Sequence, residues 1–513
     1  MTIKDKELSP KVIYQFFKDA FSKGNNYFMN GSVINDSLDF LKNILDLEME
    51  SLNGEQRRDI LRHLSKSTVK MWGELLRQAL DTLDNGDDFE HHDTIRGVSR
   101  LKQYLSKFKE FEILLYGSDE WYRDTIYHQL WFFFVGLYLF SYKDQDRSLM
   151  DLLIEKKYWY CDPSDEIRDK TGITQDKARY AFFCVIALCH DLGKPLQMVH
   201  PINDAIRAML KEYKFLHFSP FKVEFPITYE AMLNSLVERL GQIGIPYKDK
   251  DSSPFTTRIG REIGGREERK NDSYYIKMEK YMHKEPHMQS TFSTTLAELN
   301  HGMISCLLLM ESFRRFKGTE IYQNWRIDQP KDDPKEIWIH KSYMTSQYIL
   351  KSIAYHSIEN LEIIEIDLPL FWILLVDDLI EDYRPTRAGK DFMLYNLCNV
   401  KIKKFSIEDI HIRFEFNHPV KKKPNLEKKK ELDQEINKEA NFENKDNINF
   451  EDDFIFFFID KLERYFYLLQ LKDFKFTMEI IELSGDKERY QIIFNYARKK
   501  DQKDPNINVK LKD

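Results

Sequence analysis

Histidine and aspartate side chains recur inside the most apolar segments of this 513-residue chain. A polar side chain in an apolar helix is costly unless it is hydrogen-bonded, paired or bound to a metal ion. The residues of this kind are His128 in RDTIYHQLWFFF, the pair His190 and Asp191 in CVIALCHDLGKP, His301 in ELNHGMISC, His356 in IAYHSI, and Asp377 in LLVDDLIEDYRP. Each alone is more simply a hydrogen-bonded core residue. Together they supply the imidazole and carboxylate ligands that suit first-row divalent metals, so the set predicts a metal site.

The pair His190–Asp191 stands at the end of the apolar run CVIALC. This run predicts a helix fixed in the core, whose last turn holds the two side chains rigidly. Gly193 is expected to let the chain leave the helix, and Pro195 to prevent its continuation. The spacing therefore predicts a rigid pair of ligands at the end of a buried helix.

Three cationic side chains follow the expected ligands closely and are candidates for binding substrate. Lys194 could bind a phosphate as a point charge, or could simply be solvated at a helix end. The guanidinium groups of Arg384 and Arg387, in DYRPTR, suit phosphate or carboxylate. A structural salt bridge with Glu381 or Asp382 is an equal alternative for either arginine.

The phrase HDLGKP resembles the central motif of the HD-domain superfamily of metal-dependent phosphohydrolases, and the resemblance covers residues 118–387 apart from an insertion. It implies two divalent ions as cofactors, of Mn, Mg, Fe, Co or Ni. The implied ligands are His128, His190, Asp191 and Asp377 for one ion and His301 and His356 for the other, with Asp191 bridging both. Asp378 stays open as the alternative to Asp377. His190 and Asp191 are implied for catalysis, and Lys194 is added as a catalytic candidate because it lies next to this pair.

Two features of the cyclic-dinucleotide branch of that superfamily are absent from the sequence. His356 is followed by Ser357 instead of a second histidine, and a Gly-Tyr-Pro motif is missing. Hydrolysis of cyclic-di-GMP is therefore not supported. A further group, His91–His92–Asp93, imitates a ligand cluster, but its polar surroundings (NGDDFEHHDT) favour a surface turn.

Helix-period patterns dominate the chain up to about residue 400, and strand-like alternation follows. The expected fold is mainly α: an all-α HD-domain helical core with an insertion, plus a small α/β C-terminal domain. The expected divisions are an N-terminal helical region at 1–115, the first part of the core at 116–200, an insertion with a polar loop at 201–295, the second part of the core at 296–400, and the α/β domain at 401–513 with a charged loop at 421–447. Within that last domain, strands are expected over 407–418, 474–484 and 489–497, with a helix over 450–469.

The composition restricts the environment and the partners of the protein. A net charge of −7 and a pI near 6.1 give no overall attraction to nucleic acid. The five cysteines are scattered, several of them within apolar helical patterns, as reduced thiols are. The N-terminus has no apolar leader, and stretches such as LWFFFVGLYLF are shorter than the roughly 18–20 residues of a membrane span. A cytoplasmic protein without membrane contact is expected.

These observations predict a phosphohydrolase that uses metal-activated water to cleave a phosphoester or phosphoanhydride bond. The expected substrate is a nucleotide or another small phosphorylated molecule. The alternatives are an HD-type nuclease and a catalytically silent HD module that binds a ligand. The runs RIGREIGGREERK and KKKPNLEKKK could contact nucleic acid, but acidic residues interleave with both, so this partner is less favoured. A protein partner or a homo-oligomer stays open.

Overall fold

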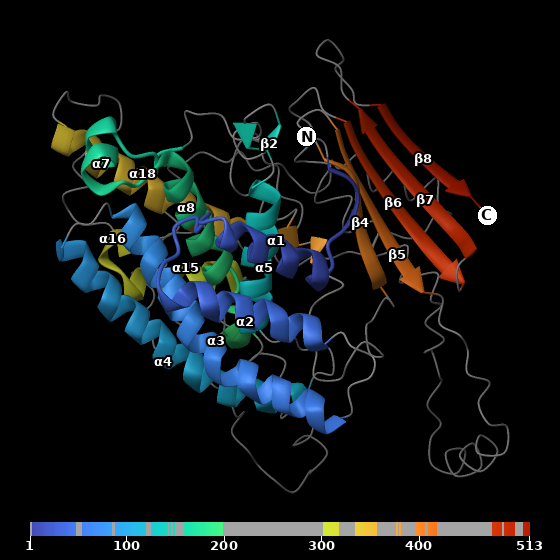
Figure 1. Ribbon diagram of the computed structural model, residues 1–513, viewed down its shortest axis with the longest axis horizontal. Helices are drawn as coiled ribbons and strands as arrows, with labels where there is room; N and C mark the ends of the chain where they lie inside the picture. The colour runs from blue at the N-terminus through green and yellow to red at the C-terminus, as the bar shows by residue number, and fades with distance from the viewer. Residues whose placement is uncertain are drawn as a thin grey trace, which may run out of the picture.

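The computed structural model describes residues 3–47, 54–84, 88–118, 125–141, 143–144, 147–148, 159–197, 301–317, 334–356, 376–377, 379–380, 397–405, 409–417, 475–484, 487–497 and 506–512. Over these ranges the protein is mainly helical, as the sequence predicts. Figure 1 shows the helices gathered into one body, with a β-sheet beside it. The predicted insertion at 201–295, the charged loop at 421–447 and the helix at 450–469 lie outside the described residues.

The helical body is built from helices that come from both halves of the chain. They are α1 (Pro10–Ser22), α2 (Ser32–Leu47), α3 (Gly54–Leu83), α4 (Asp88–Ser118), α5 (Thr125–Phe140), α7 (Asp165–Thr171), α8 (Gln175–Cys189), α9 (Lys194–Gln197), α15 (His301–Ser312), α16 (Arg314–Lys317) and α18 (Pro334–Tyr355). Helix α8 packs against α3, α5 and α18, while α15 packs against α4, α9, α16 and α18. Segments far apart in the sequence therefore meet around α8 and α15.

Helices α5 and α8 are buried almost completely because their apolar residues surround the whole helix. Every residue of α5 is buried, so LWFFFVGLYLF is a core element, as predicted. The two helices approach closely where Gly136 of α5 meets Phe183 of α8: a Cβ added to this glycine would lie 2.2 Å from the Phe183 ring. Thr174 caps the start of α8, since its hydroxyl accepts a hydrogen bond from the amide of Lys177 at 3.3 Å.

The sheet contains strands from both ends of the chain, in the order β1-β4-β5-β6-β7-β8. The strands are β1 (Ile3–Glu7), β4 (Leu397–Phe405), β5 (Asp409–Asn417), β6 (Lys475–Ser484), β7 (Lys487–Ala497) and β8 (Asn506–Lys512). Neighbours are antiparallel except β5 and β6, which are parallel. A separate short pair joins β2 (Lys143–Asp144) to β3 (Arg147–Ser148).

One face of the β4–β5 pair is apolar, because alternate residues of a strand point to the same side and the central ones here are aliphatic or aromatic. Ile402 lies opposite Ile412, and Val400 opposite Phe414; all four side chains are buried. Between them, Lys401 forms an ion pair with Glu415 at 2.9 Å on the other face. This alternation fixes the register, since a slip of one residue would exchange the two faces.

The three strands predicted in the C-terminal region correspond to β5, β6 and β7, and are confirmed. Strands β4 and β8 were not predicted, and β4 runs across the division expected at residue 400. The N-terminal region is not purely helical, because β1 (IKDKE) pairs with β4. Such a short, charged strand has no apolar alternation by which a sequence pattern could identify it. No described helix has both the length and the apolarity to cross a membrane.

Candidate metal centre

The structure brings all six predicted metal ligands together from five separate places in the chain. His128 belongs to α5, His190 and Asp191 directly follow α8, His301 is the first residue of α15, His356 directly follows α18, and Asp377 belongs to the short helical stretch at 376–377. His190, Asp191 and His356 therefore stand at the ends of α8 and α18, and His128 lies one turn inside its helix. This placement lets rigid helices aim side chains at one point.

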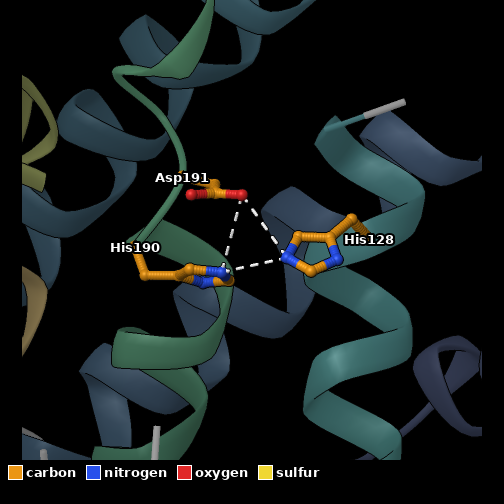
Figure 2. Close-up of side chains that lie close together, drawn as sticks. All are labelled: His128, His190 and Asp191. Atoms are coloured by element: carbon orange, nitrogen blue, oxygen red, sulfur yellow. Dashed lines mark hydrogen bonds and ion pairs between the residues drawn. The ribbon is translucent and has the colours of Figure 1, made fainter. Parts of the chain in front are cut away.

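Three of these side chains form the first group, shown in Figure 2. The Nε2 atoms of His128 and His190 are 3.3 Å apart, and Asp191 Oδ2 lies 3.4 Å from the former and 3.7 Å from the latter. Ligand atoms about 2.0–2.1 Å from one ion at a tetrahedral angle lie roughly 3.4 Å apart. The spacing of the group therefore fits a metal ion.

Asp377, the remaining predicted ligand, contacts one member of the first group. Its Oδ1 atom lies 3.2 Å from Nε2 of His128. The neighbouring Asp378, left open as the alternative, lies outside the described residues. The carboxylate of Asp377 thus lies beside the first group, in contact with His128.

The second group uses the other oxygen of the same aspartate. Asp191 Oδ1 lies 3.0 Å from Nε2 of His301 and 3.3 Å from Nε2 of His356, and the two histidine nitrogens are 3.1 Å apart. One carboxylate thus faces a histidine pair with each of its oxygens. A bridging carboxylate between two divalent ions requires this arrangement, and both groups have the composition of a metal site.

Backbone carbonyls orient two of the histidine rings. Nδ1 of His190 lies 2.8 Å from the carbonyl oxygen of Ala187, and Nδ1 of His356 lies 2.7 Å from that of Ile353. Because a carbonyl oxygen only accepts, each proton lies on Nδ1, and the Nε2 lone pair is left to point at the centre. Metal-bound histidines are typically held in this way.

The protonation states of the centre also suit a metal ion. Burial lowers the pKa of His190 from 6.5 to about 3 and that of His301 to about 4, although Asp191 opposes both shifts. Burial alone would raise the pKa of Asp191, but Lys194, followed by His190 and His301, holds it well below its usual range. At neutral pH the two imidazoles are therefore neutral and the carboxylate is charged, which are the forms that bind metals.

Exposure is unequal around the centre and gives it one open side. His190 and His356 are almost completely buried, whereas His301 retains 18% and Lys194 29% of its side-chain exposure. The Lys194 ammonium lies 3.8 Å from Asp191 Oδ2. A ligand would reach the centre on the side of His301 and Lys194. The other predicted substrate residues, Arg384 and Arg387, lie outside the described residues.

The turn after α8 differs from its sequence-based interpretation. Gly193 has no left-handed backbone conformation; instead, a Cβ at this position would lie 2.3 Å from the carbonyl oxygen of His301. Pro195 does not simply end the helix, because it lies in the short helix α9, which begins at Lys194. The glycine is required here by the close approach of α15, a contact between segments that spacing alone could not reveal.

Sequence reasoning missed two residues that hold this turn. Ser305 of α15 contacts Gly193 and the two backbone carbonyls of His190 and His301. The Tyr104 hydroxyl of α4 donates to the carbonyl of Leu192 at 2.8 Å. The signal for Ser305 was weak but present, since it is a hydroxyl four residues after a candidate ligand in an apolar helix.

The cluster at 91–93 is helical and not a surface turn, because it lies in the first turns of α4. His91 Nδ1 lies 2.8 Å from Asp81 Oδ1, and Asp93 accepts a hydrogen bond from the amide of Arg314 at 2.7 Å. Both side chains therefore join α4 to neighbouring helices, and neither lies in the metal centre.

Comparisons with family models, curated proteins and solved structures find no match to this chain.

Proposed function

We propose that this protein is a metal-dependent phosphohydrolase, with an HD-type helical core, that cleaves a phosphoester or phosphoanhydride bond of a small phosphorylated substrate. The observation that carries the proposal is the position of Asp191, whose two oxygens each face a pair of histidine nitrogens. A nucleotide is the preferred substrate class. The resemblance of HDLGKP to the HD motif gives the same reaction class.

The side chains of the centre would have two roles: some would bind the metal ions, and one would bind the substrate. His128, His190 and Asp377 would hold one ion, and His301 and His356 the other, with Asp191 between them. Two divalent ions held there would supply an activated water and neutralise charge on a phosphoryl oxygen. Lys194, at the open side, would hold a nonbridging phosphate oxygen as a point charge.

A small substrate is favoured over a polymer for two reasons. The chain is acidic overall, with a net charge of −7, which repels a long polyanion. The basic runs that could bind nucleic acid, at 258–270 and 421–430, are interleaved with acidic residues. The alternatives are nuclease action and a silent binding module, and the experiment below separates them from the proposed function.

The location proposed for this reaction is the cytoplasm. Cys184, Cys189 and Cys306 are free and buried. Burial also raises their pKa values well above the usual range. Such thiols stay protonated and are typical of proteins from reducing compartments.

Phosphate release from a panel of nucleotides and phosphoesters, with Mn²⁺ or Mg²⁺, tests the proposal. Wild type is expected to release phosphate, and Asp191→Ala is expected to reduce the release to that of buffer, because the shared carboxylate is lost. Asp81→Ala is the matched control, since Asp81 also contacts a histidine, His91, but stands outside the centre. It should retain activity.

Two results would contradict the proposal. If metal-loaded wild type releases no phosphate from any substrate of the panel, the silent binding module is favoured. If it cleaves nucleic acid instead, with retention on nucleic acid that weakens as salt is raised, the nuclease alternative is favoured.

A further inference from the structure

Ser305 occupies a fully buried position in α15, one turn after the ligand His301. Its hydroxyl oxygen lies 2.8 Å from each of three backbone groups: the amide of Gly193, the carbonyl of His190 and the carbonyl of His301. The amide donates to Ser305, and the single hydroxyl proton is shared between the two carbonyls. The contact thus joins the backbone of a first-group ligand to that of a second-group ligand.

The close approach of the two segments makes this contact specific. Gly193 lies so near α15 that an added Cβ would stand 2.6 Å from Ile304 Cβ and 2.9 Å from the amide of Ser305. No larger residue fits between the turn and the start of the helix. The hydroxyl therefore sets the distance between Asp191 and His301, which belong to these two segments.

Helix α15 also contacts α18, the helix that precedes His356. Cys306, the next residue, contacts the carbonyl of Leu350 in α18 through its Sγ atom at 3.2 Å. Burial holds the pKa of this thiol well above its usual range, so it keeps the proton that it donates. Helix α18 ends directly before His356, whose ring lies 4.9 Å from that of His301 between centroids.

We propose that Ser305 is a positioning residue that fixes the second histidine pair, His301 and His356, against the His190–Asp191 turn. The inference rests on the proposed two-ion centre. It adds a residue that holds the first and second groups at a fixed distance from each other. Without the hydroxyl, the amide of Gly193 and the carbonyls of His190 and His301 lose these hydrogen bonds. The start of α15 then moves relative to Asp191, so the second ion loses affinity while the first keeps its ligands.

Titration of Mn²⁺ into the metal-free full-length protein, followed by calorimetry and by metal content after gel filtration, tests this role. The binding event that His301→Ala abolishes is assigned to the second pair. Ser305→Ala is expected to weaken that event about 10- to 100-fold, as loss of an outer hydrogen bond to a metal ligand does, and to leave the other event unchanged. Ser305→Thr keeps the hydroxyl and should restore the second event.

Ser37→Ala is the matched control, because Ser37 is equally buried in a helix and its hydroxyl contacts Met29 Sδ at 3.9 Å, away from the centre. It should change neither event. Gly193→Ala perturbs the same junction and supplies a second variant if Ser305→Ala does not fold; it should also weaken the second event selectively.

Equal affinities in Ser305→Ala and wild type would overturn the inference, as would equal weakening of both events, which marks a general structural role. Wild type that binds two ions but fails to release phosphate would contradict the proposed reaction while leaving the role of Ser305 intact. Wild type that binds fewer than two ions would overturn both.

Discussion

Asp191 carries a negative charge in a buried position because its surroundings compensate for the lost water. Burial alone would raise its pKa. The Lys194 ammonium and the facing histidines lower the pKa by more than burial raises it, so the carboxylate stays ionised. The opposite holds for His190 and His301, which burial keeps neutral. One buried environment thus yields a charged acid and neutral bases, which is the protonation pattern that a metal ion needs.

This protonation pattern predicts that the metal-free protein loses stability in mild acid. The pKa of His190 is about 3 when folded, against 6.5 in an unfolded chain. As pH falls from 6.5 toward 3, the unfolded chain gains a proton that the folded protein does not, so the free energy of unfolding decreases. The slope approaches about 1.4 kcal/mol per pH unit for this group.

His190→Asn should flatten that slope by about the same amount, because asparagine has no proton to gain. Denaturant unfolding of chelator-treated wild type and variant, at several pH values between about 6.5 and 5, measures the difference. Identical slopes in the two proteins would mean that His190 is not held neutral by burial.

The six candidate ligands could be singled out by residue type, since a histidine or aspartate within an apolar run is exceptional wherever the run folds. Ser305 and Tyr104 could not be predicted in the same way. Their partners are backbone carbonyls on other segments, and serine and tyrosine are ordinary residues in a helix. The clustered histidines and aspartates could thus be identified in the sequence, whereas the residues that support them depend on the packing.

Among the elements, the end of α8 and the start of α15 form the contact on which the centre depends. The carbonyl of His301 would lie 2.3 Å from a Cβ at Gly193, and real Cβ contacts are not that short. The sequence correctly placed a glycine-containing turn here. It assigned the glycine to backbone freedom, however, because the segment that approaches it is more than 100 residues away in the chain.

Gly193→Ala is expected to destabilise the protein by about 1–3 kcal/mol, the cost of overpacking a buried contact. Gly172→Ala provides the comparison, since Gly172 ends α7 at φ +68° with open space around it, and alanine there costs about 1–2 kcal/mol through backbone conformation alone. Chemical denaturation should therefore find similar losses in stability. Only Gly193→Ala should also weaken metal binding, so an equal loss of metal affinity in both variants would contradict the packing argument.

In the whole molecule, the sheet joins the two ends of the chain. Figure 1 shows β4 to β8 as one curved layer, with the N-terminus at its β4 side. Strand β1 covers the edge of β4 through antiparallel pairs such as Lys4 with Lys404. The central strands were predictable from their alternation, but β1 was not, because edge pairing of a charged five-residue strand depends on a partner that the local sequence does not specify.

Removal of residues 1–7 should expose β4 as a sheet edge. Its backbone amides are then expected to exchange hydrogen faster, since one row of ladder bonds is lost, and the protein should self-associate more readily. Hydrogen exchange of a peptide covering 397–405 measures the first effect, and gel filtration measures the second.

Strand β7 is the internal control, because β6 and β8 flank it on both sides in either protein. A peptide covering 487–497 should keep its protection. Unchanged protection of β4 would show that β1 contributes nothing to the edge, and equal loss of protection in β7 would indicate general unfolding.

The pairing of β1 with β4 has a consequence for synthesis of the protein on the ribosome. About 390 residues separate Glu7 from Leu397, and at 5–20 residues per second roughly 20–80 s pass between their translation. During that interval the first strand has no partner, although most of the segments that form the helical body have already emerged. The nascent protein can thus begin to assemble its helices early, whereas sheet closure is among the last events of its biogenesis.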